Sequence, residues 1–230
     1  MVYVCSDIHA QYDLFVKLLA RINFCNNDVM YIGGDVIDKG NDSVRLMQLI
    51  MKMPNVHVIK GNHEHDFLKY YWRLMKQSPT DFNGVLKKLQ GYFAFDGHLL
   101  DWDTVDFIEA LPYCLQTDNF ILVHAGLPID NNNRVVSLNS VNVEYLVYDR
   151  VFKGPNLLPQ TDKCVFYGHT PSNYICGEHK IIKYKRAGAI GNSISDYCKI
   201  HLDVGSWIEG NILGCFCVDN CKEYYVYEKD

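Results

Sequence analysis

Three short motifs in the first third of the chain constrain its fold more than any other feature. They are DIH at positions 7–9, GDVIDKG at positions 34–40 and GNHE at positions 61–64, and each follows a short apolar run. Asp7, Asp35 and Asn62 recur at intervals of 28 and 27 residues, about the length of one strand–helix–strand unit. Because parallel strands end at one edge of a sheet, this spacing predicts that the three motifs lie together there.

The apolar pattern between the motifs supports this α/β topology. Residues 2–5, 29–32 and 56–59 are predicted as buried strands, and residues 12–22 and 43–51 carry apolar side chains at helical spacing. The sequence therefore predicts two successive strand–helix–strand units with parallel strands.

The rest of the chain is predicted to complete the same domain. Helices at 64–75, 80–90 and 102–110 would form an insert covering about residues 64–112. Two further strands, at 120–123 and 164–167, lead into His124 and His169. The segments 201–204, 212–218 and 223–228 predict antiparallel strands joined by turns. Residues 1–230 contain no linker-like segment, so we expect a single catalytic domain.

Composition excludes some classes of partner. The net charge of -5 and the isoelectric point of about 6.0 leave no broad basic field for nucleic acid or a membrane surface. No apolar run approaches the roughly 20 residues that cross a bilayer. The nine cysteines are scattered, and the first motif begins too early to leave room for a signal peptide. We therefore expect a cytoplasmic protein with reduced thiols and with no nucleic-acid or membrane partner.

The carboxylate, amide and imidazole side chains of the motifs predict a centre of two divalent metal ions. The six predicted ligands are Asp7, His9, Asp35, Asn62, His124 and His169. Asp7 and His9 are placed on the first ion, and Asp35 bridges both because a carboxylate has two oxygens. These ligands suit manganese, our first choice, or iron or zinc, and the lack of cysteine argues against a closed structural zinc site. A bridging water or hydroxide of lowered pKa would be the nucleophile.

The neighbouring polar residues are predicted to handle protons and phosphate. His63 is predicted as the general acid, and the carboxylate of Asp38 would keep it protonated beside two cations. Lys39 and Arg150, together with Asn62, are predicted to bind phosphate oxygens. The alternatives are that Asp38 is a simple turn carboxylate and that Arg150 forms only a surface salt bridge.

Seven motifs, in order, resemble those of the calcineurin-like metallophosphoesterase superfamily. Besides the first three, they are HAG at 124–126, YDR at 148–150, GHT at 168–170 and LDVG at 202–205. Within the superfamily, the chain is most similar to the phage-lambda-type and bacterial serine/threonine phosphoprotein phosphatases. The resemblance implies a β-sandwich of two mixed sheets flanked by helices, a dinuclear metal site at the sheet edge, and direct attack by the bridging hydroxide.

Two positions depart from the pattern of that family. Ala10 stands where the family usually has glycine, which matters only if the backbone there needs a positive φ. Lys39 stands where the family usually has arginine. An ammonium group lacks the planar fork of a guanidinium, so we expect weaker phosphate binding or a different substrate preference.

The resemblance predicts a phosphoric monoester hydrolase that acts on phosphoserine and phosphothreonine in a phosphoprotein or phosphopeptide, with phosphotyrosine and small phosphomonoesters as further substrates. The first alternative is a symmetrical bis(5'-nucleosyl)-tetraphosphate hydrolase. Glu64 argues against it, because those hydrolases typically carry aspartate there. A phosphate-binding pseudoenzyme is the third interpretation. The sequence does not decide the oligomeric state, and a monomer is compatible with it.

Two other features are interpreted as structural. The run 180–186 carries four cationic residues and is predicted as a solvated strand or loop face, with guidance of an acidic phosphopeptide as the alternative. Cys215 and Cys217 lie two residues apart in an apolar strand and are predicted to pack in the core, not to bind metal.

Overall fold

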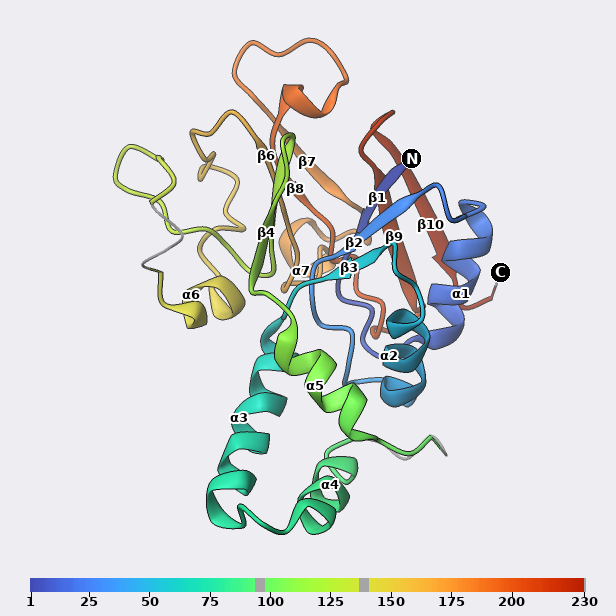
Figure 1. Ribbon diagram of the computed structural model, residues 1–230. Helices are drawn as coiled ribbons and strands as arrows, with labels where there is room; N and C mark the ends of the chain where they lie inside the picture. Colours follow the sequence, from blue (N-terminus) through green and yellow to red (C-terminus); the bar gives the residue numbers. More distant parts are fainter. Residues whose placement is uncertain (94–97, 137–140, 230) are drawn as a thin grey trace.

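The computed structural model describes residues 1–93, 98–136 and 141–229 and contains two five-stranded sheets (Figure 1). The first sheet has the order β10-β9-β1-β2-β3, and the second has the order β4-β5-β6-β8-β7. The strands of the first sheet are β1 (Val2–Cys5), β2 (Val29–Ile32), β3 (Val56–Val58), β9 (Ile212–Cys217) and β10 (Lys222–Tyr227). Those of the second are β4 (Cys114–Gln116), β5 (Phe120–Val123), β6 (Cys164–Tyr167), β7 (Ile182–Lys185) and β8 (Tyr197–His201).

Both sheets are mixed, as the sequence predicted. In the first sheet β1 pairs parallel with β2 and β2 with β3, whereas β9 pairs antiparallel with β1 and with β10. In the second sheet β6 pairs parallel with both β5 and β8, and the outer strands β4 and β7 are antiparallel. The predicted class, two mixed sheets flanked by helices, is therefore confirmed.

Alternating side chains divide the core into layers. On β1, Tyr3 and Cys5 face the helices, while Val4 faces the second sheet and packs in the cluster that contains Phe120 and Phe166. On β5, Ile121 and its cluster lie on the opposite, outer face of the second sheet. Strands buried on both faces explain why the apolar runs of the sequence are nearly continuous.

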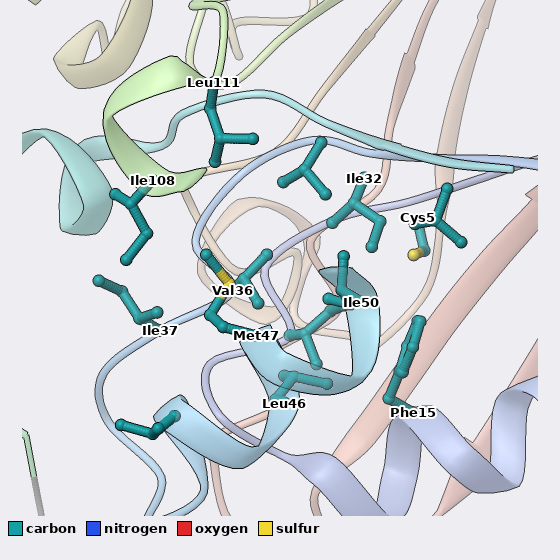
Figure 2. Packing of buried hydrophobic residues seen from close by; sticks show 14 of the residues in the cluster. Cys5, Phe15, Ile32, Val36, Ile37, Leu46, Met47, Ile50, Ile108 and Leu111 are labelled. Carbon is teal, nitrogen blue, oxygen red and sulfur yellow. The ribbon is translucent and has the colours of Figure 1, made fainter. Parts of the chain in front are cut away.

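The helices pack mainly against the first sheet and beside it (Figure 1). They are α1 (Tyr12–Arg21), α2 (Ser43–Met51), α3 (Asn62–Gln77), α4 (Phe82–Gln90), α5 (Trp102–Ala110), α6 (Val143–Tyr148) and α7 (Asn173–Cys176). Figure 2 shows α2 inserting Met47 and Ile50 into a fully apolar cluster with Val36 and Ile37. The two apolar residues of the second motif thus fix the loop that carries Asp35.

The C-terminal third differs in part from the prediction. The hairpin of β9 and β10 is antiparallel as expected, but the strand predicted at 201–204 is wrong. The strand there is β8, which ends at His201, and its pairing with β6 is parallel. Lys199 lies in the middle of β8 and is fully buried, with its ammonium group donating to the carbonyl oxygens of Phe152 at 2.6 Å and Gly154 at 2.8 Å. A charged side chain in a buried strand masks the apolar pattern.

The cysteine pair and the basic run, both interpreted as structural, make contacts within the fold. Cys215 and Cys217 are fully buried in the first-sheet cluster. In the basic run, Lys183 pairs with Glu223 at 2.5 Å, and the Arg186 guanidinium donates to the carbonyl oxygens of Thr161, Lys163 and Ser195. The charges of this run are therefore largely taken up within the fold. Across the described residues, no helix has the length and apolar character required to traverse a bilayer.

Candidate active site

The loops after β1, β2 and β3 meet at one edge of the first sheet, as the spacing predicted, and are hydrogen-bonded to one another. The Asp7 N–H donates to the carbonyl oxygen of Gly34 at 3.1 Å, and the His9 N–H donates to that of Asp35 at 2.8 Å. Main-chain hydrogen bonds therefore hold the first two motifs in register, independently of any side chain.

Glu64, in the first turn of α3, ties the third motif to the second. Its carboxylate is fully buried and accepts four backbone N–H groups, those of Gly61, Asp35, Val36 and Ile37, at 2.8 to 3.1 Å. Sequence reasoning used Glu64 to choose between substrates. The structure gives it a different role, because every one of these contacts is to the protein backbone.

Left-handed backbone conformations are concentrated in the site. Seven of its non-glycine residues have positive φ, namely Asp7, His9, Ala10, Asp35, Asp38, Lys39 and His169. Residues held in this region cost free energy and persist where the surrounding structure over-determines them, which is typical of functional sites. Ala10, with φ of 57°, is the position where the family usually has glycine, so its extra methyl group is not neutral.

Ala10→Gly is therefore expected to stabilise the protein. Relief of the left-handed conformation should outweigh the added entropy of the unfolded chain and raise the free energy of unfolding by about 0.5 to 1 kcal/mol. Urea denaturation followed by circular dichroism measures this. The matched control is Ala20→Gly in helix α1, an exposed right-handed position, which should lose about 1 kcal/mol instead. A loss of stability in both variants would contradict the argument from φ.

The Asp35 carboxylate lies at the centre of the site. Its Oδ2 is 3.6 Å from His9 Nε2, 3.4 Å from His124 Nε2 and 3.8 Å from His63 Nε2. Two groups of side chains can each hold a metal ion, one formed by His9, Asp35 and His63 and the other by Asp35, His124 and His169, with potential ligand atoms within 4.8 Å of one another. Asp35 is the member common to both groups, as a bridging ligand must be.

The second sheet supplies the two histidines of the second group. His124 follows β5 and His169 follows β6, and Asn62 Oδ1 lies 3.0 Å from His124 Nε2 and 2.8 Å from His169 Nδ1. His124 Nδ1 is 2.8 Å from the carbonyl oxygen of Gly33, which requires a proton on Nδ1 and makes Nε2 the nitrogen that could bind a metal ion. Asn62, His124 and His169 are thus brought together as the sequence predicted.

Asp7 is placed between the two sheets. Its Oδ2 accepts the Ser6 hydroxyl at 2.5 Å, and its Oδ1 accepts the backbone N–H of His169 at 3.0 Å. Asp7 is not a member of the two groups above, in which His63 accompanies His9. Its assignment to the first ion therefore stays a prediction.

Two glycines allow these close approaches. A methyl group on Gly61 would lie 2.0 Å from Asp35 Oδ1, and one on Gly168 would lie 2.0 Å from Asp7 Oδ2. Any larger residue at either position would push a carboxylate out of place, so the glycines of GNHE and GHT are required by packing and not by backbone freedom.

Burial controls the charges of the ionisable groups. It raises the pKa of Asp7 to about 7, and together with nearby His124 it lowers the pKa of His169 to about 3. His124 behaves differently: burial lowers its pKa, but the charge and hydrogen bond of Asp35 together with the charge of Asp7 outweigh burial and raise the pKa to about 10. Several carboxylates and imidazoles sharing one buried site are best balanced by bound cations. The donor set therefore fits a pair of divalent ions.

His63 and Asp38 make the contact that the sequence predicted. His63 Nδ1 is 2.8 Å from Asp38 Oδ2. Burial lowers the pKa of His63, but this hydrogen bond and the negative charges of Asp35 and Glu64 together outweigh burial and hold the pKa above its ordinary value. The same contact lowers the pKa of Asp38, which also has a turn role, since its Oδ1 accepts the Lys39 N–H at 2.7 Å. A protonated imidazole is therefore favoured at the edge of the site.

The two predicted phosphate-binding cations lie at the rim. Arg150 follows α6 and donates to the Thr170 hydroxyl at 3.2 Å, beside His169, and within the described part of the chain it has no carboxylate partner. The Lys39 ammonium lies 5.1 Å from the ring centroid of Trp207. Sequence reasoning missed Trp207, whose only signal was its place just after the LDVG motif.

A large cavity among the described residues lies away from these side chains. It has a volume of about 660 Å³ and is lined by residues such as Leu158, Pro159 and Arg186, and by none of the predicted site residues. The Arg186 guanidinium is already committed to three carbonyl oxygens, so the cavity offers no free cation for a phosphate. The chemistry is therefore concentrated at the sheet edge.

Comparison with known proteins agrees with this arrangement. A family model described as calcineurin-like phosphoesterase matches residues 1–195. The symmetrical bis(5'-nucleosyl)-tetraphosphatase of Wigglesworthia glossinidia brevipalpis is 40% identical over 81 residues, covering 34% of this chain and 30% of that protein. The protein of the same name from Haemophilus ducreyi is 30% identical over 130 residues, covering 54% and 44%. The chain thus spans less than half the length of these curated relatives.

A solved structure supports the fold over nearly the whole chain. The crystal structure of a provisionally assigned diadenosine tetraphosphatase superposes with a TM-score of 0.70, covering 98% of this chain and 92% of that one. Its sequence identity of 16% limits the comparison to the fold.

These relatives contradict the predicted phosphoprotein phosphatase. The curated relatives are named for a dinucleoside tetraphosphate, a phosphoanhydride, and not for a phosphoprotein monoester. The prediction was wrong because it gave weight to Glu64, whose carboxylate is fully buried and bonded to backbone N–H groups. A side chain that contacts only the protein backbone does not indicate which substrate binds.

Proposed function

Because this chain belongs to the calcineurin-like phosphoesterase family, we propose that it is a metal-dependent hydrolase that cleaves symmetrical dinucleoside tetraphosphates. The observation that supports this substrate is the activity for which the curated relatives are named; these relatives are 40% and 30% identical over the matched segments. The donor set centred on Asp35 supports the metal dependence.

Six residues would hold the metal ions. Asp35 would bridge them, with Asp7 and His9 on one side and Asn62, His124 and His169 on the other. Two bound divalent ions supply neutralisation of phosphate charge and a water molecule of lowered pKa. We propose manganese first, because oxygen and imidazole ligands without cysteine suit it, with iron and zinc as alternatives.

The other residues would bind and orient the substrate. Arg150 and Lys39, at the rim, would contact phosphate oxygens that do not face the ions, and the Asn62 amide would donate to a third. His63, held protonated by Asp38 at 2.8 Å, would deliver a proton to the departing oxygen. Cations at the rim suit a tetraphosphate particularly well, because it carries about four negative charges at neutral pH.

The overall reaction consumes one water molecule. Its oxygen bonds to the phosphorus on one side of the central anhydride, and the central P–O bond breaks. Two nucleoside diphosphates form, and up to two protons are released because the new terminal phosphate groups are mostly ionised at neutral pH. The departing oxygen belongs to a phosphate group, which is much less basic than the alkoxide released from a phosphoserine. The demand on the general acid is correspondingly smaller.

A comparison of three substrates tests the proposal. The protein is incubated with manganese and with diadenosine tetraphosphate, a phosphoserine peptide or p-nitrophenyl phosphate. We expect kcat/KM for the dinucleotide to exceed that for the peptide by about 100-fold, because binding energy from the second nucleotide is available only there. Chromatography should show ADP as the only nucleotide product, and EDTA should abolish turnover until manganese is restored. Release of ATP and AMP, or turnover of the peptide alone, would contradict the proposal.

A further inference from the structure

Trp207 has an unusual position for so large an apolar side chain. It is 36% exposed and belongs to none of the three hydrophobic clusters formed by the described residues. Its ring centroid lies 6.1 Å from that of His9, with the ring planes at 83°, and the Lys39 ammonium lies 5.1 Å from its centroid. The indole is therefore next to the metal-binding side chains and contributes little to the core.

The backbone around Trp207 is fixed to the catalytic loops. The preceding residue, Ser206, is buried, and its hydroxyl donates to the carbonyl oxygens of Asp7 at 2.5 Å and Ile8 at 3.1 Å. Gly205, with φ of 85°, makes the turn that brings the chain back from β8 to this point. The loop that carries the indole is thus anchored to the first motif, which positions the ring relative to His9.

The geometry points to a nucleobase subsite: we propose that Trp207 is the platform on which one base of the substrate stacks, an inference that rests on the function proposed above. A nucleotide joins an anionic phosphate to a flat aromatic base, and the site offers a point cation and a flat indole 5.1 Å apart. With the central phosphates at Asp35 and His9, each base is separated from them by one further phosphate and a ribose, and we place one of the two bases on the indole beside His9.

Lys39 fits the same arrangement. Within the described residues its ammonium has no ion-pair partner, and its contact is with the face of the indole. A lysine carries its charge on a flexible four-carbon stem, so the ammonium can move from the ring to the phosphate chain when a base takes its place. An arginine there would stack its planar guanidinium on the indole and compete with the base. Lysine in place of the family's arginine at position 39 therefore leaves the face of the Trp207 indole available for a base.

Stacking predicts which inhibitors Trp207 should distinguish. Because every base has a π face, the subsite should bind adenine and guanine nucleotides with similar affinity, and it should ignore ligands that lack a base. ADP and methyl diphosphate share the diphosphate and differ in the nucleoside. Their inhibition constants, measured with p-nitrophenyl phosphate as the substrate, separate contacts to the base from contacts to phosphate.

The test compares Trp207→Ala and Trp207→Phe with the unchanged protein. Trp207→Ala should raise the inhibition constant of ADP about tenfold more than that of methyl diphosphate, and Trp207→Phe should give an intermediate ratio. Trp72→Ala, which removes another exposed indole on α3, is the matched control and should leave the ratio unchanged. An equal change for both inhibitors in Trp207→Ala would overturn the inference.

A spectroscopic measurement covers the case in which Trp207→Ala does not fold. The chain has three tryptophans, so Trp72→Phe combined with Trp102→Phe leaves Trp207 as the only indole. ADP should quench its fluorescence and methyl diphosphate should not; quenching by neither overturns the subsite. The proposed function is judged separately, by turnover of diadenosine tetraphosphate in the unchanged protein. Absence of that turnover would refute the function, whereas turnover combined with an unchanged inhibitor ratio would refute only the role of Trp207.

Discussion

Asp35→Asn is expected to lower the metal content below two ions per chain and to reduce kcat/KM by about three orders of magnitude. The substitution removes a charge at the point where three imidazole nitrogens converge within 3.4 to 3.8 Å of one oxygen. An amide cannot bridge two cations as a carboxylate does, so both groups that contain Asp35 lose their common ligand. Inductively coupled plasma mass spectrometry of the purified variant, together with steady-state kinetics, measures both effects.

The fold should survive this change. The amide oxygen introduced at position 35 can still accept the His63 N–H, and the backbone contact of residue 35 with Glu64 does not depend on the side chain there. Asp28→Asn is the matched control, since Asp28 is also a buried aspartate but pairs with the N-terminal ammonium at 2.7 Å, outside the site. It should keep normal metal content and turnover. Full metal occupancy in Asp35→Asn would remove Asp35 from the bridging position.

The sequence predicted the parts of the fold that have a strong local signal. β1, β2, β5 and β6 have the bounds expected for them, because each is a short apolar run that ends at a glycine or a polar residue. Helix α2 was also predicted residue for residue. The motif spacing then indicated that these strands end at one edge, and the hydrogen bonds between the first two loops show that they do.

The missed elements depend on contacts that are remote in sequence. β8 was misplaced because Lys199 is satisfied by the carbonyl oxygens of residues 152 and 154, more than forty positions earlier. Burial lowers the pKa of Lys199 to about 8, which shows how unfavourable this environment is for its charge. Helix α6 and strand β4 are too short to show a period of their own. Such elements are stabilised by tertiary packing more than by local propensity.

The sequence anticipated that three of the predicted ligands meet, but it did not indicate the roles of two neighbouring residues. Asn62, His124 and His169 meet as predicted, since each follows a strand whose end is fixed by the sheet. The role of Glu64 could not be read from its motif, because three of its four partners are backbone N–H groups of another loop. The positive φ of Ala10 was likewise hidden, since only the three-dimensional path of the loop requires it.

His63→Asn is expected to discriminate between substrates by their leaving groups. Loss of the general acid should cost about 100-fold or more in kcat for an alkyl phosphate, whose alkoxide needs a proton. For p-nitrophenyl phosphate or a dinucleoside tetraphosphate the loss should be about tenfold or less, because those leaving groups are weakly basic. A plot of log kcat against leaving-group pKa should therefore be steeper for the variant than for the unchanged protein.

Metal analysis of the same variant separates two roles that the geometry allows. His63 Nε2 lies 3.8 Å from Asp35 Oδ2 and is grouped with His9 and Asp35 as a potential ligand, whereas its Nδ1 lies 2.8 Å from Asp38. If His63 is the general acid, His63→Asn should keep its metal content. Asp38→Asn should then show a weaker form of the same leaving-group dependence, because it removes a carboxylate that raises the pKa of His63. Loss of an ion from His63→Asn, with equal rate losses for all substrates, would instead identify His63 as a ligand.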